Sequence, residues 1–570
     1  MPGRWDEHMT TIEVNRSRAR RRFALSWNSA ALALLGLMIL LVVCTFHDYG
    51  VTWDEDVHNW YGVFVMDYYL SAFVDTRALH WQDLINYGAA FDMTAALINR
   101  ISPFGTYETR HLLNGLTGIL GLVGAWKAGR FLAGPRAGLF AAVLLATIPN
   151  WYGQMYNNPK DIPFAVGNIW ALYYLCRIVA VLPRPPASLV LKLGIAIGMS
   201  LGVRVGGLLL IAYAGLGGVA FCLWRGFETK SVKVAVVEGW TGIWRAFLPV
   251  LVVAYPVMLL FWPWAQQDPI DHPLSALATF SHETFPFNTL FAGQYFPATD
   301  LPWEYLPTHI VLALPELTML LALVALPGAI LLQLQRAGGP DRTRSLQILL
   351  IATAILFPVC YAVAIKAVLF DGMRHFIFVL PPIALSAALV GDQLFERLRQ
   401  FRYRQLLVAA LALYGVGHIT IMVLLHPDEY VYYNGFVGGV KGAETLFKTD
   451  YWANSYAEAV KGLTNYLETE YGAEFEDHDF TVAVCGPPIS ANYFFPDNLV
   501  YTTDRAKADF FIAFTKDNCD KSLPGQEVFR VERMGALLSI VLDRRDYVGQ
   551  DQKAPPTFQD PASQSGSPAH

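Results

Sequence analysis

A run of acidic residues directly follows the first long apolar segment of the chain. Residues 52–58 read TWDEDVH, and the apolar segment covers residues 27–46. Carboxylates at a membrane boundary lose part of their hydration, so acids kept there are candidates for a function. A partly desolvated carboxylate can take a proton from a hydroxyl group, and Asp54 is the first candidate for such a general base. His58 follows Asp54 by four residues and would share its face of a helix.

Glu55 has two interpretations that the sequence leaves equally open. Thr52 and Glu55 have the spacing of a capping box, in which the two residues satisfy each other's backbone N–H groups at a helix N-terminus. Glu55 could also take part in catalysis beside Asp54. The capping box does not require Asp54, so for that residue we favour the catalytic role.

A second polar motif, residues 157–161 with the sequence NNPKD, lies between two later apolar segments. Pro163 suits the first turn of a helix, so Asp161 could simply cap that helix. Asp161 could instead be a second catalytic acid. Lys160 beside it could bind a phosphate group. We predict a catalytic role for Asp161 and a phosphate-binding role for Lys160.

Several cations stand alone at the ends of later apolar segments. Arg204 lies among glycines between two such segments, and Arg374 is followed by His375. Ionisable groups at membrane depth are functional candidates, although long basic side chains can also extend to the lipid headgroups. We favour phosphate binding for Arg204, Arg374 and His375. Lys366 is a further cation of this kind.

A chain that spans a membrane many times must position these residues. Of its 570 residues, 54% are hydrophobic and 16% are charged, whereas soluble domains carry about 25% charged residues. The break at residues 203–207 could be a bend in one helix or a boundary between two. Eleven segments are predicted to cross the bilayer: 27–46, 111–126, 137–152, 163–182, 189–203, 206–224, 246–264, 308–333, 346–365, 375–392 and 405–425.

The distribution of basic residues predicts the orientation. Residues 1–26 are rich in arginine and are predicted to be cytosolic, whereas residues 265–307 contain no Lys or Arg. Eleven crossings keep the arginine-rich loops inside, which favours two helices around the break at 203–207. The predicted outer regions are the loops 47–110, 150–162 and 265–307 and the domain 427–548. A formal net charge of -5 gives no basis for a nucleic-acid partner.

The C-terminal region has the pattern of a small soluble α/β domain. A helical stretch at 438–471 precedes short strand-like runs at 481–485, 509–514 and 536–542. Cys485 and Cys519 could pair if this domain lies outside the cytosol. The tail 549–570 is predicted to be disordered. Metal ligands do not cluster in the sequence, so no cofactor is predicted, although a divalent metal remains compatible with it.

The order and sidedness of these motifs resemble the polyprenyl-phosphate-sugar-dependent glycosyltransferases of the C-type membrane superfamily. This superfamily includes the protein O-mannosyltransferases of glycosyltransferase family 39 and the aminoarabinose transferases of lipid A. The pattern is most similar to the bacterial protein-mannosyltransferase-like group, also called phospholipid carrier-dependent glycosyltransferases. Asp54, Glu55 and His58 resemble the acidic motif of the family's first outer loop, and residues 158–161 resemble its second motif. The resemblance covers residues 25–425.

This resemblance implies an all-α polytopic bundle of about eleven transmembrane helices with a small C-terminal α/β domain. It implies sugar transfer from a polyprenyl-phosphate donor to a hydroxyl of a protein, lipid or glycan, by one inverting displacement with Asp54 as the base. Lys160, Arg204, Arg374 and His375 would contact the donor phosphate. We assign His58 and Asp92 to acceptor or sugar binding, although Asp92 lies where many relatives carry a His-Pro-Pro segment.

The loop 265–307 is too short for the extra sugar-binding domain of eukaryotic O-mannosyltransferases, which favours a bacterial inner membrane as the location. Two other functions stay open at this stage. The chain could be a lipid-linked sugar flippase or transporter, or an assembly protein whose C-terminal domain binds a partner.

Overall fold

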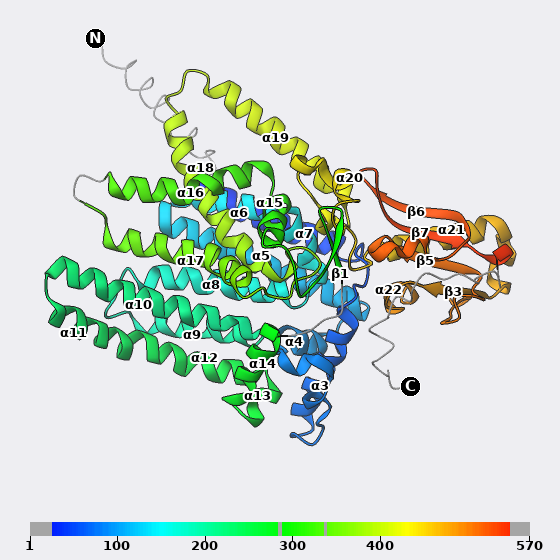
Figure 1. Ribbon diagram of the computed structural model, residues 1–570, viewed down its shortest axis with the longest axis horizontal. Coiled ribbons are helices and arrows are strands. Elements are labelled where there is room, and N and C mark those ends of the chain that lie inside the picture. The colour runs from blue at the N-terminus through cyan, green and yellow to red at the C-terminus, as the bar shows by residue number, and fades with distance from the viewer. Residues whose placement is uncertain (1–25, 283–287, 336–338, 548–570) are drawn as a thin grey trace, which may run out of the picture.

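The computed structural model describes residues 26–282, 288–335 and 339–547 of the chain. Long helices run side by side along the longest dimension of the molecule, and a domain containing the larger β-sheet covers one end of them (Figure 1). The predicted cytosolic N-terminus, apart from its last residue, and the predicted disordered tail lie outside the described residues.

The long helices follow the order of the predicted apolar segments. They are α2 (Trp27–Thr45), α5 (Thr106–Ala133), α6 (Pro135–Ala146), α7 (Pro149–Asn157), α8 (Asp161–Ile178), α9 (Ala187–Leu201), α10 (Leu208–Thr229), α11 (Val232–Gly242), α12 (Leu248–Leu260), α16 (Glu316–Leu334), α17 (Arg342–Ala364), α18 (Leu380–Leu398) and α19 (Arg404–Leu425). The connections near the C-terminal domain contain α3 (Glu55–Leu70), α4 (Ala90–Asn99), α13 (Pro263–Gln267), α14 (Asp271–His282), the strands β1 (Asn288–Phe291) and β2 (Gln294–Pro297), α15 (Tyr305–Ala313) and the 3-10 helix η5 (Arg374–Val379).

Within the described residues, seven helical stretches have the length and apolar composition needed to cross a membrane. The other four predicted spans coincide with helices that are shorter or less apolar: α5, α6 with α7, α8 and α9. The chain is therefore a multi-pass integral membrane protein, and the predicted fold class is confirmed.

Side chains on the outer helices have the composition expected for contact with lipid. On α19, the side chains of Leu406, Leu413, Val416 and Val423 are all more than 60% exposed. Apolar surface of this extent is costly in water and is normal toward hydrocarbon. The exposed face of α19 therefore supports its assignment as a membrane helix.

Proline divides two of the segments that were predicted as single helices. The segment 137–152 is interrupted before Pro149, where α6 ends and α7 begins, and the segment 308–333 is interrupted before Pro315, between α15 and α16. The residue that precedes a proline disfavours the helical conformation, which explains both breaks. At residues 203–207 the structure has a boundary between α9 and α10, as predicted.

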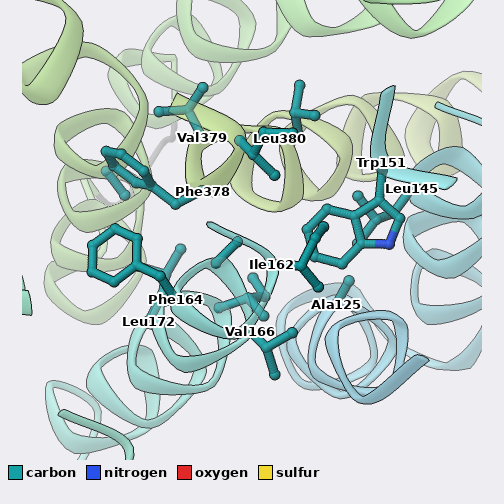
Figure 2. Packing of buried hydrophobic residues seen from close by; sticks show 14 of the residues in the cluster. Ala125, Leu145, Trp151, Ile162, Phe164, Val166, Leu172, Phe378, Val379 and Leu380 are labelled. Carbon is teal, nitrogen blue, oxygen red and sulfur yellow. The ribbon is translucent and has the colours of Figure 1, made fainter. Parts of the chain in front are cut away.

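A row of glycines on α5 brings the central helices close together. A Cβ atom on Gly121 would lie 2.5 Å from the ring of Trp151, and one on Gly118 would lie 2.5 Å from Met155. Trp151 is fully buried and lies beside Leu145 and Ala125 in the core (Figure 2). Small residues at such positions are typical of helix packing in membranes, where close contact replaces the hydrophobic effect.

The C-terminal domain is an α/β unit, as predicted. Its five-stranded sheet has the order β4-β3-β5-β7-β6, in which β3 is parallel to both neighbours and β7 is antiparallel to both of its neighbours. The strands are β3 (Phe480–Val484), β4 (Leu499–Tyr501), β5 (Phe510–Phe514), β6 (Gln526–Arg533) and β7 (Ala536–Asp543). A disulfide joins Cys485 to Cys519, so the pairing left open by the sequence is present.

The predicted single helix at 438–471 is wrong. The structure has a short helix α20 (Gly439–Ala443) and a longer helix α21 (Tyr456–Tyr471), separated by irregular backbone. This irregular segment contains Asp450, Asn454 and Ser455, whose side chains form hydrogen bonds at the junction with the membrane module. These hydrogen bonds stabilise irregular backbone here in place of a continuous helix.

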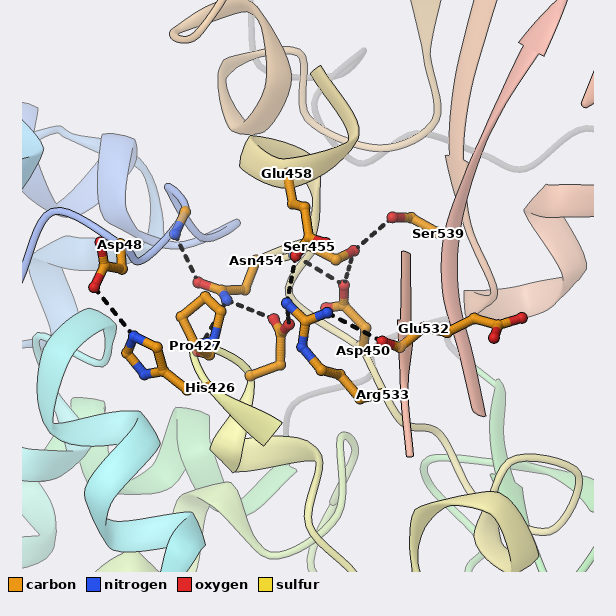
Figure 3. Close-up of polar contacts among 12 residues, drawn as sticks. Asp48, His426, Pro427, Asp450, Asn454, Ser455, Glu458, Glu532, Arg533 and Ser539 are labelled. Carbon is orange, nitrogen blue, oxygen red and sulfur yellow. Dashed lines mark hydrogen bonds and ion pairs between the residues drawn. The ribbon is translucent and has the colours of Figure 1, made fainter. Parts of the chain in front are cut away.

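Asn454 joins the C-terminal domain to two separate parts of the membrane module. Its Oδ1 accepts hydrogen bonds from Gly50 N at 2.9 Å and Asn157 Nδ2 at 3.0 Å, while its Nδ2 donates to Asp428 Oδ1 at 2.6 Å. Asp428 forms an ion pair of 3.0 Å with Arg533 on β6 (Figure 3). One amide therefore fixes the segment before the first polar motif and the first residue of the second.

We predict that Gly50→Ala weakens this junction. A Cβ at Gly50 would lie 2.2 Å from the backbone oxygen of Asn454, so the domain must shift. Overpacking of this kind costs about 1–3 kcal/mol. The midpoint of thermal unfolding in detergent should fall for Gly50→Ala, while Gly36→Ala, where no atom lies within 4 Å, serves as the control. Equal midpoints for the two variants would contradict the close contact.

Candidate functional site

Asp54 lies between two cations from distant parts of the chain. Its Oδ2 is 2.9 Å from Lys160 Nζ and 3.2 Å from Arg374 Nη1. The side chain of Arg374 is only 5% exposed, so this is a largely buried cluster of charges. Burial alone would raise the pKa of Asp54, but the charges of Lys160 and Arg374 outweigh it and hold that pKa well below its usual value. Asp54 is therefore an anion paired with two cations.

Glu55, which begins α3 (Glu55–Leu70), has the contacts of a capping residue. Its Oε2 accepts hydrogen bonds from Thr52 N at 2.8 Å and from Thr52 Oγ1 at 3.1 Å. Its Oε1 lies 3.0 Å from His111 Nε2, and its side chain is 1% exposed. These contacts occupy both oxygens of Glu55, and they favour the capping interpretation over the catalytic one.

Asp161, the first residue of α8, forms an ion pair with Arg204. Its other oxygen accepts a hydrogen bond from Asn158 Nδ2 at 3.0 Å, and Asn158 Oδ1 in turn accepts one from Asp161 N at 3.0 Å. Asn158 therefore caps the helix, and Asp161 is left to hold Arg204. The alternative in which Asp161 only caps this helix is therefore not supported, and the catalytic role predicted for Asp161 stays a prediction.

The break between α9 and α10 positions Arg204. Residues 87–90 of the first outer loop pair with this break, through hydrogen bonds from Gly88 N to Val203 O at 3.2 Å and from Ala90 N to Gly202 O at 2.9 Å. Gly88 allows this approach, because a Cβ there would lie 2.2 Å from Gly202 O. The loop segment that departs from the family pattern therefore holds the phosphate-site candidate Arg204 in place.

His58 and Asp92, predicted to bind the acceptor or the sugar, are paired with each other. His58 Nδ1 lies 2.8 Å from Asp92 Oδ2, and Arg110 Nη2 donates to Asp92 Oδ1 at 2.5 Å. The side chains of His58 and Asp92 are 3% and 4% exposed. Burial would raise the pKa of Asp92, but His58 and Arg110 outweigh it and lower that pKa. These residues form a buried group next to Asp54, and their contact with a sugar stays a prediction.

His375 lies close enough to interact electrostatically with Asp54, Lys160, Arg204 and Arg374. Its ring contacts that of Phe370, with 4.8 Å between the ring centroids. The structure therefore brings six of the predicted residues together: Asp54, Lys160, Asp161, Arg204, Arg374 and His375. Lys366, by contrast, pairs with Asp300 at 3.2 Å on the surface, where both side chains are more than 70% exposed.

Sequence reasoning missed Asp371, which lies within this cluster. Its Oδ2 is 3.8 Å from Arg374 Nη1, and its side chain is 5% exposed. Its backbone has φ +55°, a conformation that non-glycine residues adopt rarely and that often marks a functional position. Arg110 and His111 were also missed, since nothing in their local sequence distinguishes them from other polar residues in a helix.

The cluster can bind an anion beside a carboxylate. Lys160, Arg204 and Arg374 supply three positive charges, Asp54, Asp161 and Asp371 supply three negative charges, and Lys516 beside Asp371 adds a fourth cation. Cations in a site of low exposure stabilise a negative charge that grows during a reaction. Among the described residues, no group of three or more His, Cys, Asp or Glu side chains is arranged to hold a metal ion.

Residues 92–264 match the family model described as dolichyl-phosphate-mannose-protein mannosyltransferase. The matched segment contains Lys160, Asp161 and Arg204 but not Asp54 or Arg374, and it is less than a third of the chain. The match confirms the predicted resemblance to membrane glycosyltransferases and the predicted enzyme class. None of the curated proteins matches this chain.

Two solved structures with a similar arrangement of helices are distant from this chain in sequence. The chain is 13% identical to ArnT from Cupriavidus metallidurans bound to undecaprenyl phosphate, with a TM-score of 0.45 over 90% of this chain and 97% of that one. It is 11% identical to the oligosaccharyltransferase AglB from Archaeoglobus fulgidus in complex with an inhibitory peptide and a dolichol-phosphate, with a TM-score of 0.47 over 85% and 69%. With TM-scores below 0.5, these likenesses do not decide the function.

We predict that Glu55→Gln lowers the stability of the protein. The substitution replaces a buried carboxylate by an amide that faces Thr52 and His111, and lost hydrogen bonds to charged groups cost about 1–3 kcal/mol. The thermal unfolding midpoint should fall, whereas that of Glu474→Gln at an exposed position should not change. A Glu55→Gln protein that unfolds at the wild-type temperature would show that the charge of Glu55 beside His111 contributes little to stability.

Proposed function

We propose that this chain transfers a sugar from a polyprenyl-phosphate donor to an acceptor hydroxyl on the non-cytosolic side of a membrane. The observation that carries the proposal is the contact of one carboxylate, Asp54, with two cations, Lys160 and Arg374, at 2.9 and 3.2 Å. A phosphate-linked sugar needs both kinds of group, since a base must take a proton while cations meet the charge of the leaving phosphate.

In the proposed reaction, Asp54 takes the proton from the acceptor hydroxyl. The oxygen then attacks the anomeric carbon, and the bond between that carbon and the phosphate oxygen breaks in the same displacement. The configuration at the carbon is inverted, and polyprenyl phosphate leaves with one more negative charge than the donor had. Lys160, Arg204 and Arg374 stabilise this added charge, so a general acid is not needed.

Donor binding should itself activate the base. In the unliganded protein, Lys160 and Arg374 hold the pKa of Asp54 low, which makes it a weak base. A bound phosphate would share the same two cations and weaken their hold on Asp54. The pKa of Asp54 would then rise toward the value that its burial favours, once the donor is in place.

Two further observations support the proposal, one on the position of the donor and one on the orientation of the chain in the membrane. Phe378 follows Arg374 by one helical turn and lines a small pocket between helices, together with Asn168, Tyr213 and Pro382. We propose that the first isoprene units of the lipid carrier bind against this segment, one helical turn from Arg374. The disulfide Cys485–Cys519 supports an oxidising, non-cytosolic compartment for the C-terminal domain, in agreement with the arginine distribution. A bacterial inner membrane stays our proposal for the location.

The first test measures release of lipid phosphate. Purified protein is incubated with polyprenyl-phosphate sugars and candidate acceptors, with EDTA present, because the proposal assigns the phosphate charge to protein cations and not to a metal. Wild type should release free polyprenyl phosphate, and Asp54→Asn should lower kcat by about 10²-fold or more, the usual size of a base contribution. Lipid-linked sugar that crosses proteoliposomes without bond cleavage would favour a flippase, and activity only with nucleotide sugars would rule out the donor class.

A second test uses the pH dependence of kcat/KM, which reports ionisation in the free enzyme. Since the pKa of Asp54 is held below its usual value, its protonation should cause no loss of kcat/KM between pH 8 and about 5. Lys160→Met removes one of the opposing charges, so the pKa should rise and an acid limb should appear in that range. Lys160→Arg, which keeps the charge, is the control. Profiles of the same shape for wild type and Lys160→Met would contradict this electrostatic account.

A further inference from the structure

The C-terminal domain places the side chain of Lys516 beside the charged cluster. Its Nζ lies 3.5 Å from Asp371 Oδ1 and donates a hydrogen bond to Tyr451 O at 3.4 Å. The side chain is only 14% exposed, and burial lowers the pKa of Lys516 despite its acidic neighbours. A lysine kept at such a position is expected to compensate a specific buried charge.

Asp371 connects Lys516 to the proposed phosphate site. It lies between Lys516 at 3.5 Å and Arg374 at 3.8 Å, and Arg374 in turn lies 3.2 Å from Asp54. Positive and negative charges therefore alternate from the C-terminal domain to the proposed base. Asp371 forms ion pairs with Lys516 and Arg374, so the loss of Lys516 would leave Arg374 to compensate Asp371.

The loss of Lys516 would weaken the binding of a phosphate at Arg374. Arg374 is the cation that Asp371 and a bound phosphate would compete for. When Lys516 is present, its positive charge neutralises Asp371, so the guanidinium of Arg374 is available to bind a second anion. Without it, Arg374 would pair with Asp371, because an uncompensated buried carboxylate is strongly unfavourable. The anion affinity of the site should therefore depend on a residue that is not itself in contact with Asp54.

The same surface of the C-terminal domain also holds the residue before Asp54. Lys516 Nζ lies 4.8 Å from the ring centroid of Trp53. On Gly486, which has φ +88°, an added Cβ would lie 3.2 Å from the Trp53 ring. The disulfide Cys485–Cys519 joins the residue before Gly486 to the 3-10 helix η9 (Lys516–Lys521), which begins with Lys516. The disulfide thus fixes the contacts of Lys516 and Gly486 with Trp53 in the acidic motif.

We propose that Lys516 is a positioning residue that the C-terminal domain supplies to the phosphate site, where it neutralises Asp371 so that Arg374 is free to bind the donor phosphate. The disulfide Cys485–Cys519 keeps Lys516 at that place. This inference rests on the proposed function, since it names a residue that sets the affinity of the same site for its lipid phosphate.

The test measures binding of undecaprenyl phosphate to the full-length protein in detergent. Lys516→Met should weaken binding by about tenfold or more, the size expected when one charge interaction of about 1.4 kcal/mol is lost. Lys516→Arg should bind nearly as well as wild type. Lys521→Met, at an exposed position on the same η9, is the matched control and should have no effect.

A double substitution separates this role from a structural one. Asp371→Asn removes the charge that Lys516 neutralises, so Lys516→Met combined with Asp371→Asn should regain most of the lost affinity. Cys519→Ser should weaken binding in an otherwise wild-type chain and should add little to Lys516→Met. A double variant that binds as poorly as Lys516→Met would overturn the inference.

The outcomes distinguish this inference from the proposed function. If wild type does not bind undecaprenyl phosphate, the proposed donor class fails and the inference fails with it. If wild type binds and Lys516→Met binds equally well, only the role of Lys516 is wrong, and the phosphate site stands. Thermal unfolding of each variant identifies any that are misfolded, and Lys516→Gln, which also removes the charge, replaces Lys516→Met if that variant is among them.

Discussion

The structure depends on the pairing of buried charge. Asp54 can stay ionised with a side chain only 20% exposed because Lys160 and Arg374 lie within 3.2 Å of it. Removing a carboxylate from water is strongly unfavourable unless an opposite charge accompanies it. Each of these cations comes from a different connection between membrane helices. Those connections must therefore meet at one end of the bundle. Much of the irregular backbone there brings these charged residues together.

The irregular segments hold one another in place. Residues 87–90 pair with the break between α9 and α10 and so fix Arg204, which pairs with Asp161. Asn454 fixes the segments before Asp54 and Asp161 with a single amide. Non-helical backbone at membrane depth has to satisfy its polar groups within the protein. The same hydrogen bonds that meet this requirement also set the distances between the charges.

Much of this arrangement could be predicted from the sequence. Long apolar segments identified the membrane helices, and isolated charges at their ends identified most of the cluster, because both signals are local. Pro149 and Pro315 divide helices that we predicted as continuous, since the strength of the apolar signal was given more weight than the prolines. The role of Glu55 depends on His111, and that of Arg374 on Asp371 and Lys516. Such pairings join residues far apart in the chain, and no local pattern reports them.

The position of Asn454 has a consequence for how the protein is made. The ribosome synthesises the chain from its N-terminus, so every membrane helix up to α19 is made before Asn454. Asn454 contacts Gly50 and Asn157, which are both synthesised much earlier. The early helices can insert into lipid before Asn454 is present to join the segments that precede Asp54 and Asp161. The charged cluster around Asp54 can therefore reach its final arrangement only after Asn454 and Lys516 have been synthesised and have packed on the bundle.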